Sequence, residues 1–141
     1  MTQKLCLPIR VYVEDTDAGG IVYYANYLKY IERARTELIR TFGFDKPALF
    51  GSFQFVVYSV NIKYLQSAVL DDEIVATAEL INVSPTAFIV KQTVFRGNNL
   101  LIEAEVKIVC ISRDKKRPCA IPDDMLKKFQ AAIRNEQEID S

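Results

Sequence analysis

The order of hydrophobic patterns along the chain limits its fold more than any other feature. Residues 7–14 alternate apolar and polar side chains, and this period of two predicts a half-buried strand. From residue 26 to about 42 the apolar residues recur at three- and four-residue steps, which predicts a long amphipathic helix. Its apolar stripe is Tyr27, Ile31, Ala34, Leu38 and Phe42.

The opposite face of this predicted helix is charged. Glu32 with Arg35, and Arg33 with Glu37, have the spacing of neighbours on a helix surface. We therefore expect two exposed pairs, each worth about 0.2–0.5 kcal/mol. Gly43 supplies a signal for the end of the helix.

After a looser stretch at 44–52, the chain shows the pattern of successive strands separated by short breaks. The predicted strands are 53–64, 73–83, 86–96 and 100–111. Pairs of Asp, of Ser and Pro, and of Gly and Asn mark the turns between them. A helical pattern follows Pro122 and Asp123. These patterns predict an α+β fold, in which an antiparallel sheet of about five strands wraps around the long helix and a second helix ends the chain.

Composition excludes several classes of function. The 141 residues, half of them apolar, suffice for a single domain over 1–141. Basic and acidic residues balance at 18 each, so no overall field favours nucleic acid. The absence of histidine excludes Ser-His-Asp and Cys-His nucleophile systems and a His-ligated zinc.

The N-terminus has no signal-peptide pattern, and no apolar run reaches the ~18 residues of a transmembrane segment. The chain has three cysteines with no C-x-x-C spacing, which argues against disulfides and a zinc ribbon and favours reduced thiols. We therefore expect a cytoplasmic protein. A basic cluster at 113–117 has two interpretations, a solvated loop or a contact for the phosphates of a nucleotide-containing ligand.

The loop from Asp15 to Gly20 joins the first strand to the long helix and has three interpretations. As a calcium loop it fails at the fifth ligand position, where Gly19 stands, and at the last, where Asn26 replaces Glu. As a structural turn it needs only permissive glycines and capping by aspartate side chains. As a catalytic loop it supplies a carboxylate close to the N–H groups of a helix start. Spacing alone does not choose between Asp15 and Asp17.

The motif formed by Asp17, Gly20, Ile21-Val22 and Tyr23-Tyr24 resembles the active-site motif of the hotdog-fold acyl-CoA thioesterases. The resemblance is greatest to the 4-hydroxybenzoyl-CoA thioesterase and Tol-Pal-associated branches, and it extends over residues 8–126. The Tol-Pal-associated branch usually has His where this chain has Tyr24, whereas the 4-hydroxybenzoyl branch has Tyr.

The resemblance implies a hotdog fold and a role for several residues. Asp17 would be the catalytic carboxylate, and the backbone N–H of Tyr24 would stabilise the oxyanion. The substrate-binding residues implied in the same way are Gly20, Phe55, Val56, Val57 and Thr86. Residues 55–57 would form an acyl wall belonging to the neighbouring subunit, and Thr86 would contact the CoA portion. No metal or other cofactor is implied.

The chemistry agrees with this assignment. A thioester lacks much of the resonance stabilisation of an amide, so hydrolysis requires an activated water or carboxylate and an oxyanion stabiliser. Asp17 can attack the carbonyl or deprotonate water, and both roles use the ionised carboxylate, which is the common state of an aspartate near pH 7.

Two hypotheses follow. The first is a thioesterase for a short-chain or aromatic acyl-CoA, forming a homodimer or homotetramer. The second is a non-catalytic module that binds acyl-CoA or an acyl-carrier protein. The carboxylate of Asp17 favours the enzyme, because binding alone does not require it.

Overall fold

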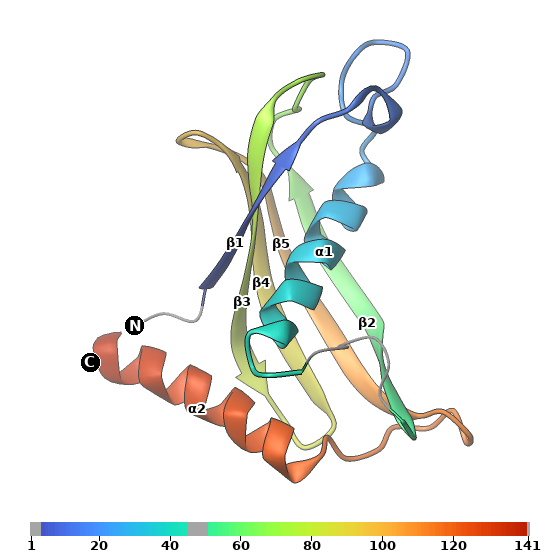
Figure 1. Ribbon diagram of the computed structural model, residues 1–141, viewed down its shortest axis with the longest axis vertical. Coiled ribbons are helices and arrows are strands. Elements are labelled where there is room, and N and C mark those ends of the chain that lie inside the picture. The colour runs from blue at the N-terminus through green and yellow to red at the C-terminus, as the bar shows by residue number, and fades with distance from the viewer. Residues whose placement is uncertain (1–3, 45–50, 141) are drawn as a thin grey trace.

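The computed structural model describes residues 4–44 and 51–140, with side chains described up to residue 133. The predicted order of one strand, one long helix, four strands and a final helix is confirmed, and a short 3₁₀ turn follows the first strand (Figure 1). The elements are β1 Lys4–Arg10, η1 Val13–Asp15, α1 Asn26–Arg40, β2 Phe53–Tyr64, β3 Glu73–Val83, β4 Ala87–Arg96, β5 Asn99–Ser112 and α2 Asp123–Asp140. Part of the predicted looser stretch, residues 45–50, lies outside the described residues.

The five strands form one antiparallel sheet in the order β1-β3-β4-β5-β2. The sheet curves around α1, which runs along its concave side, and α2 lies across the end opposite the loop that precedes α1 (Figure 1). The α+β prediction and the wrapped helix are therefore confirmed. β1 and β2 are the two edge strands, and β2 carries an irregularity between Val57 and Ser59.

Helix α1 buries the predicted apolar stripe. Tyr27, Ile31, Ala34 and Leu38 are buried against the sheet, together with Tyr30. The helix ends at Arg40, about two residues earlier than predicted. The N–H of Gly43, whose φ of +96° suits glycine, donates to the Arg40 carbonyl and completes the final turn.

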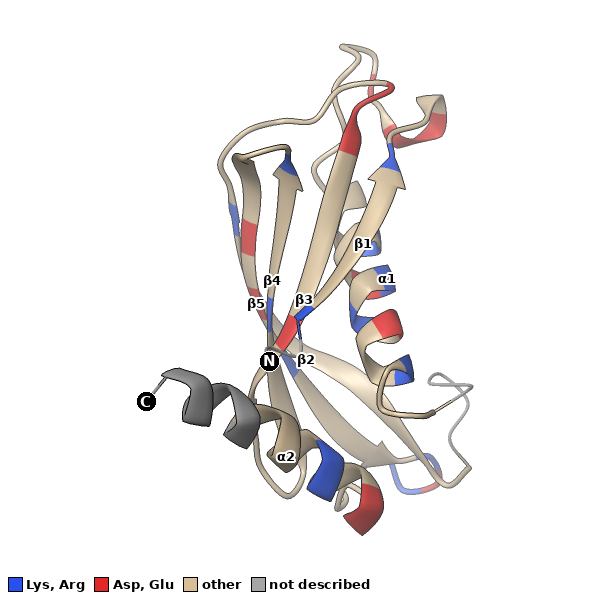
Figure 2. Ribbon diagram, turned by 60° about the vertical axis from the view of Figure 1, so that its left-hand side comes forward, with Lys and Arg blue, Asp and Glu red and all other residues tan. Residues whose placement is uncertain are grey.

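The predicted surface pairs on α1 are wrong. Residues of both charges are spread along α1 (Figure 2), but Glu37 pairs with Arg40 at 3.2 Å. Arg35 turns towards the sheet and donates to the side chain of Gln92. Arg35 is next to Ala34 on the helix surface and has the length to reach a polar group between helix and sheet, which a helical spacing rule does not consider.

The first strand is also displaced from its prediction. It ends at Arg10, and residues 11–14 leave the sheet although they continue the alternating pattern. Val11 is buried, but Val13 is 73% exposed in the 3₁₀ turn. The carboxylate of Asp15 accepts the Tyr12 N–H at 2.9 Å and holds this turn, so local capping outweighs the strand pattern.

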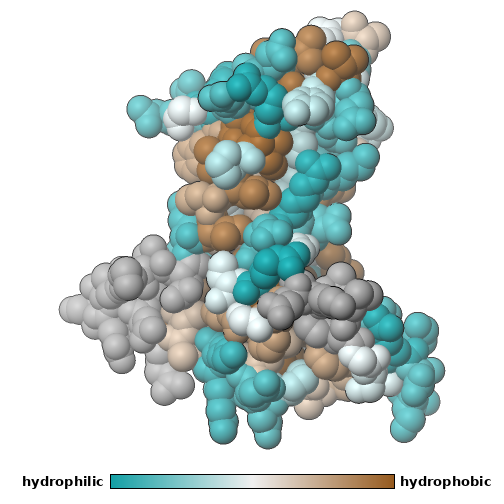
Figure 3. Space-filling view, viewed as in Figure 1, coloured by the Kyte–Doolittle hydropathy of each residue, from teal (hydrophilic) through white to brown (hydrophobic). Residues whose placement is uncertain are grey.

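The core extends beneath α2. Met125 and Phe129 of this helix are buried, and Phe129 stacks edge-to-face on Phe42 and Phe88 at ring distances of 5.2 and 5.1 Å. At the other end of the sheet, apolar side chains reach the surface (Figure 3); Ile21, Val69 and Leu70 are exposed there. That end carries the acidic loop.

Candidate active site

The acidic loop is held in one shape by its own backbone. The Asp17 N–H donates to the Ile21 carbonyl at 2.9 Å, and the Gly20 N–H donates to the Asp17 carbonyl at 3.1 Å. One oxygen of the Asp17 carboxylate accepts the Gly19 N–H at 2.8 Å. Gly20 has a φ of +83°, a conformation that a side chain disfavours. The turn therefore fixes the backbone of Asp17 while its side chain stays exposed.

Asp15 has a different environment. Its carboxylate oxygens accept the Tyr12 N–H at 2.9 Å and the side-chain amide of Asn26 at 2.8 Å, and its carbonyl accepts the Tyr23 N–H at 3.1 Å. Burial of this carboxyl opposes ionisation, but the hydrogen bonds from Tyr12 and Asn26 outweigh burial and lower the pKa of Asp15. Because Asn26 is the first residue of α1, Asp15 ties the loop to the helix start.

Tyr30 lies beneath this connection. Its hydroxyl is buried and has no hydrogen-bond partner among the described residues, and burial raises the pKa of Tyr30 to about 12. A neutral phenol is therefore the neighbour of the ionised Asp15.

The turn that leads into α1 leaves a backbone donor unused. The Asn26 N–H donates to the Tyr23 carbonyl at 2.8 Å, and the Tyr27 N–H donates to the Tyr24 carbonyl at 3.4 Å. Within residues 4–44 and 51–140, the Tyr24 N–H has no acceptor. An unpaired N–H at a helix start carries the positive end of the helix dipole and attracts negative charge.

Asp17 and Tyr24 line the same cavity, of about 440 Å³. Its other walls include Tyr27 of α1 and residues 64–67, which are the last residue of β2 and the segment after it. The Tyr64 ring contacts those of Tyr24 and Tyr27 at 6.0 and 5.9 Å, and the Tyr27 hydroxyl accepts the Ala68 N–H at 2.9 Å. No sequence pattern indicates this 64–67 wall, because these residues meet the acidic loop only in the folded chain.

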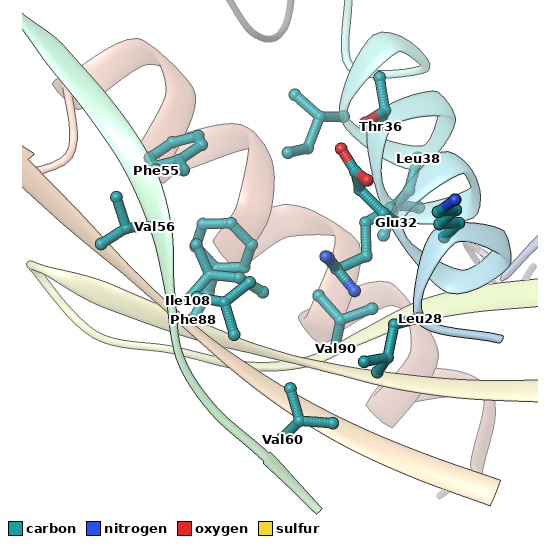
Figure 4. A pocket seen from close by; sticks show the side chains of 14 residues that line it. Leu28, Glu32, Thr36, Leu38, Phe55, Val56, Val60, Phe88, Val90 and Ile108 are labelled. Atoms are coloured by element: carbon teal, nitrogen blue, oxygen red, sulfur yellow. The ribbon is translucent and has the colours of Figure 1, made fainter. Parts of the chain in front are cut away.

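The other predicted site residues lie elsewhere in the protomer. Phe55, Val56 and Val57 line a second cavity, of about 470 Å³, between α1 and β2 (Figure 4). Thr86 is in the turn between β3 and β4, at the opposite end of the sheet from the acidic loop, where its carbonyl accepts the Cys110 N–H at 2.8 Å. One protomer thus joins Asp17 to Tyr24 but does not join either to residues 55–57 or 86.

The three interpretations of the loop are now easier to separate. Both aspartates cap backbone N–H groups, as the structural-turn interpretation requires. No group of three or more Cys, Asp or Glu side chains among the described residues could hold a metal ion. In the same part of the chain, no helix is long and apolar enough to cross a membrane.

A curved antiparallel sheet around one long helix, with an acidic loop at the helix start, defines a hotdog-fold protein. The DHNA-CoA thioesterase of Staphylococcus aureus has this fold, with a TM-score of 0.83 and 21% identity over 97% of this chain and 93% of that one. The model of the thioesterase superfamily matches residues 19–103.

Relatives agree with this match. The acyl-CoA thioesterase YbgC of Haemophilus influenzae is 40% identical over 124 residues, which are 86% of this chain and 91% of that protein. The acyl-CoA thioester hydrolase YbgC of Escherichia coli O157:H7 is 39% identical over 87% of this chain and 93% of its own length. The chain therefore belongs to the thioesterase superfamily, and it is a thioester hydrolase.

Proposed function

We propose that the protein hydrolyses a short-chain or aromatic acyl-CoA to the free acid and CoA, with Asp17 as nucleophile or general base and the Tyr24 N–H as oxyanion donor. One observation carries the proposal: Asp17 and Tyr24 share a cavity in which the Tyr24 N–H has no acceptor among the described residues. The names of the YbgC relatives support the acyl-CoA substrate.

The two possible roles of Asp17 give the same products. As a nucleophile, its carboxylate attacks the thioester carbonyl, the C–S bond breaks, CoA leaves, and water hydrolyses the resulting anhydride. As a general base, it takes a proton from water, whose oxygen attacks the carbonyl while the C–S bond breaks. In both routes negative charge develops on the carbonyl oxygen, and the free N–H of Tyr24 stabilises that charge.

We also propose that the site is completed by a second copy of the chain. Residues 55–57 belong to edge strand β2, whose exposed side chains include Val57 at 48% and Tyr58 at 71%. An exposed apolar edge strand favours pairing with another strand. A homodimer or homotetramer would place the second cavity's wall near the Asp17 loop of the neighbour. Thr86 keeps its predicted substrate contact only in such an assembly, whereas Gly20 lies in the Asp17 turn of the same protomer.

The same proposal covers the cellular location of the protein and the carrier of the acyl group. Cys6, Cys110 and Cys119 are free thiols, which fits the reducing conditions of the cytoplasm. An acyl-carrier protein is a second possible carrier of the thioester.

The test is hydrolysis of a panel of acyl-CoA and acyl-carrier-protein thioesters, measured as release of free thiol. Asp17→Asn keeps the size and the Gly19 hydrogen bond but removes the anion, so we expect turnover to fall by a factor on the order of hundreds or more. Glu14→Gln is the matched control, because it removes an exposed carboxylate three residues away and should keep the parent rate. Parent-like turnover by folded Asp17→Asn would refute the assignment.

A further inference from the structure

Two of the three cysteines meet near the end of β5, at the end of the sheet opposite the acidic loop (Figure 1). After Ser112 the chain turns and runs back beside β5 before it enters α2, and Pro118 pairs with Ile111 in this return. The Cys119 N–H donates to the Cys110 carbonyl at 2.9 Å. Cys110 and Cys119 are therefore directly opposite each other, although no C-x-x-C spacing joins them in the sequence.

The side chains of Cys110 and Cys119 lie on the same side of this pairing. Their sulfur atoms are 3.5 Å apart. Residues directly opposite on antiparallel strands have Cα atoms about 4.5–5.5 Å apart, which lies within the roughly 4.4–6.8 Å that a disulfide spans. The backbone therefore already has the spacing of a disulfide, and only the two sulfur atoms have to move closer.

The two thiols have different surroundings. Cys110 is fully buried, and burial together with the neighbouring Cys119 thiol raises the pKa of Cys110 to about 12. Its thiol is therefore a poor nucleophile by itself. Cys119 packs against the same core but is only partly buried. Of the two, Cys119 is the thiol that a small oxidant from the solvent reaches first.

The third cysteine provides a comparison within the same chain. Cys6 is exposed on edge strand β1, whereas Cys110 lies on β5. Within the described residues, no other sulfur atom pairs with that of Cys6. An oxidised Cys6 therefore has no thiol in its own chain to react with, whereas an oxidised Cys119 has the Cys110 thiol in contact.

We propose that Cys110 and Cys119 form a site of reversible oxidation, at which a hydroperoxide produces a disulfide. With hydrogen peroxide, the Cys119 sulfur attacks one oxygen: an S–O bond forms, the O–O bond breaks, and the other oxygen leaves as water with the thiol proton. The Cys110 sulfur then attacks the Cys119 sulfur. The S–S bond forms, the S–O bond breaks, and a second water leaves with the Cys110 proton. The thiols lose two electrons in total, and the peroxide gains them.

Contact between the thiols compensates for the weak nucleophilicity of Cys110, because a reaction between groups held together has a high effective concentration. The disulfide would fasten the segment that leads into α2 to β5. The Cys110 N–H donates to the Thr86 carbonyl, away from the cavity of Asp17 and Tyr24. The inference therefore does not depend on the chemistry proposed for that cavity.

The experiment treats folded Cys6→Ser with a small excess of hydrogen peroxide and measures its mass after denaturation in an alkylating reagent. Cys6→Ser is the background because the exposed Cys6 would react separately. We expect the loss of two hydrogen atoms, no alkylation, and the return of both thiols with dithiothreitol. Trypsin cleaves after the basic residues within 113–117, so the two cysteine peptides stay linked only through the disulfide.

Two variants in the same background separate the steps. Cys119→Ser removes the accessible thiol, and its buried Cys110 should react with peroxide at least about tenfold more slowly than the parent pair. Cys110→Ala removes the second thiol, so Cys119 should persist as a sulfenic acid that dimedone traps. Cys119→Ser changes one atom at a partly buried position, so it tests the proposal even if Cys110→Ala does not fold.

Three results would overturn the proposal. The first is that both thiols survive a peroxide concentration that oxidises Cys6 in the natural chain. The second is a sulfinic acid at Cys119 while Cys110 is still reduced, or links between chains alone. The third is oxidation of Cys110 in Cys119→Ser as fast as in the parent pair.

Discussion

Replacement of Tyr24 by proline tests the backbone donor directly. Tyr24→Pro removes the N–H, and Tyr24→Ala serves as the control that removes the ring but keeps the N–H. Proline is tolerated here because the Tyr24 N–H has no acceptor among the described residues, so no internal hydrogen bond is lost. Tyr24 lies in the turn that leads into α1, where the Tyr23 carbonyl accepts the Asn26 N–H and the next residue, Ala25, caps the helix with a φ of −69°. Proline is favoured at such helix starts.

The expected size of the effect follows from the single donor. Loss of one oxyanion donor costs about 3–4 kcal/mol in the barrier, so kcat of Tyr24→Pro should be about 100- to 1000-fold below that of Tyr24→Ala. Tyr24→Ala should lose much less, because the Tyr24 ring is 62% exposed and mainly contacts Tyr23 and Tyr64.

The assay is thiol release from the best acyl-CoA of the panel, with thermal unfolding followed by circular dichroism to show that both variants fold. The ratio of the two kcat values isolates the N–H, because both variants lack the tyrosine ring. If folded Tyr24→Pro turned over as fast as Tyr24→Ala, another group would have to stabilise the oxyanion.

Three further outcomes are expected. Asp15→Ala should lower the free energy of unfolding by about 2 kcal/mol, since it removes the acceptor of the Tyr12 N–H and the Asn26 amide. Because the pKa of Asp15 is lowered in the fold, its contribution to the free energy of unfolding is complete above the ordinary value of 3.8. In urea titrations the stability difference between parent and variant should therefore shrink as the pH falls below that value. A difference that stays constant with pH would contradict this role. Gly20→Ala should cost about 1 kcal/mol, also by urea titration, because φ is +83° although no atom lies within 4 Å of the added Cβ; an unchanged stability would mean that the loop adapts. Light scattering should give at least twice the 16.1 kDa of one chain, and a monomer at micromolar concentration would remove the shared site.

Local sequence patterns predicted most of the helices and strands, because the periodicity that indicates each one lies within its own residues. The bounds of β2 and β3 match their predictions; Gly51 and Ser52 precede β2, and turn residues stand at both ends of β3. The error at β1 has the opposite origin: Val13 continues the alternation, but the Asp15 carboxylate captures the Tyr12 N–H and turns the chain. A cap formed by one side chain is invisible to a pattern of apolar residues.

The candidate site was predictable only in part. The motif at 17–24 is continuous in sequence, so its resemblance to a family indicated Asp17 and Tyr24 together. The partner of Arg35 is 57 residues away on another element, and helical spacing pointed instead to Glu32. The cavity wall at residues 64–67 is likewise distant in sequence from the acidic loop that it meets. Sequence patterns therefore did not predict the contacts between elements that are distant along the chain.

Helix α1 borders both cavities, and two separate hydrogen-bonded contacts, its two anchors, hold it in place. Asp15 holds the helix start through Asn26, whereas Gln92 holds the third turn through Arg35. Because the anchors share no residue, their perturbations should separate: changes at Asp15 move the Tyr24 N–H and should lower kcat, while changes at Arg35 act on the packing of α1 against β4. Double substitution of Asp15 and Arg35 should give the sum of the two single effects on stability, within about 0.5 kcal/mol. A larger deviation would mean that the helix shifts as one body when either anchor is lost, and the two cavities would then be coupled through it.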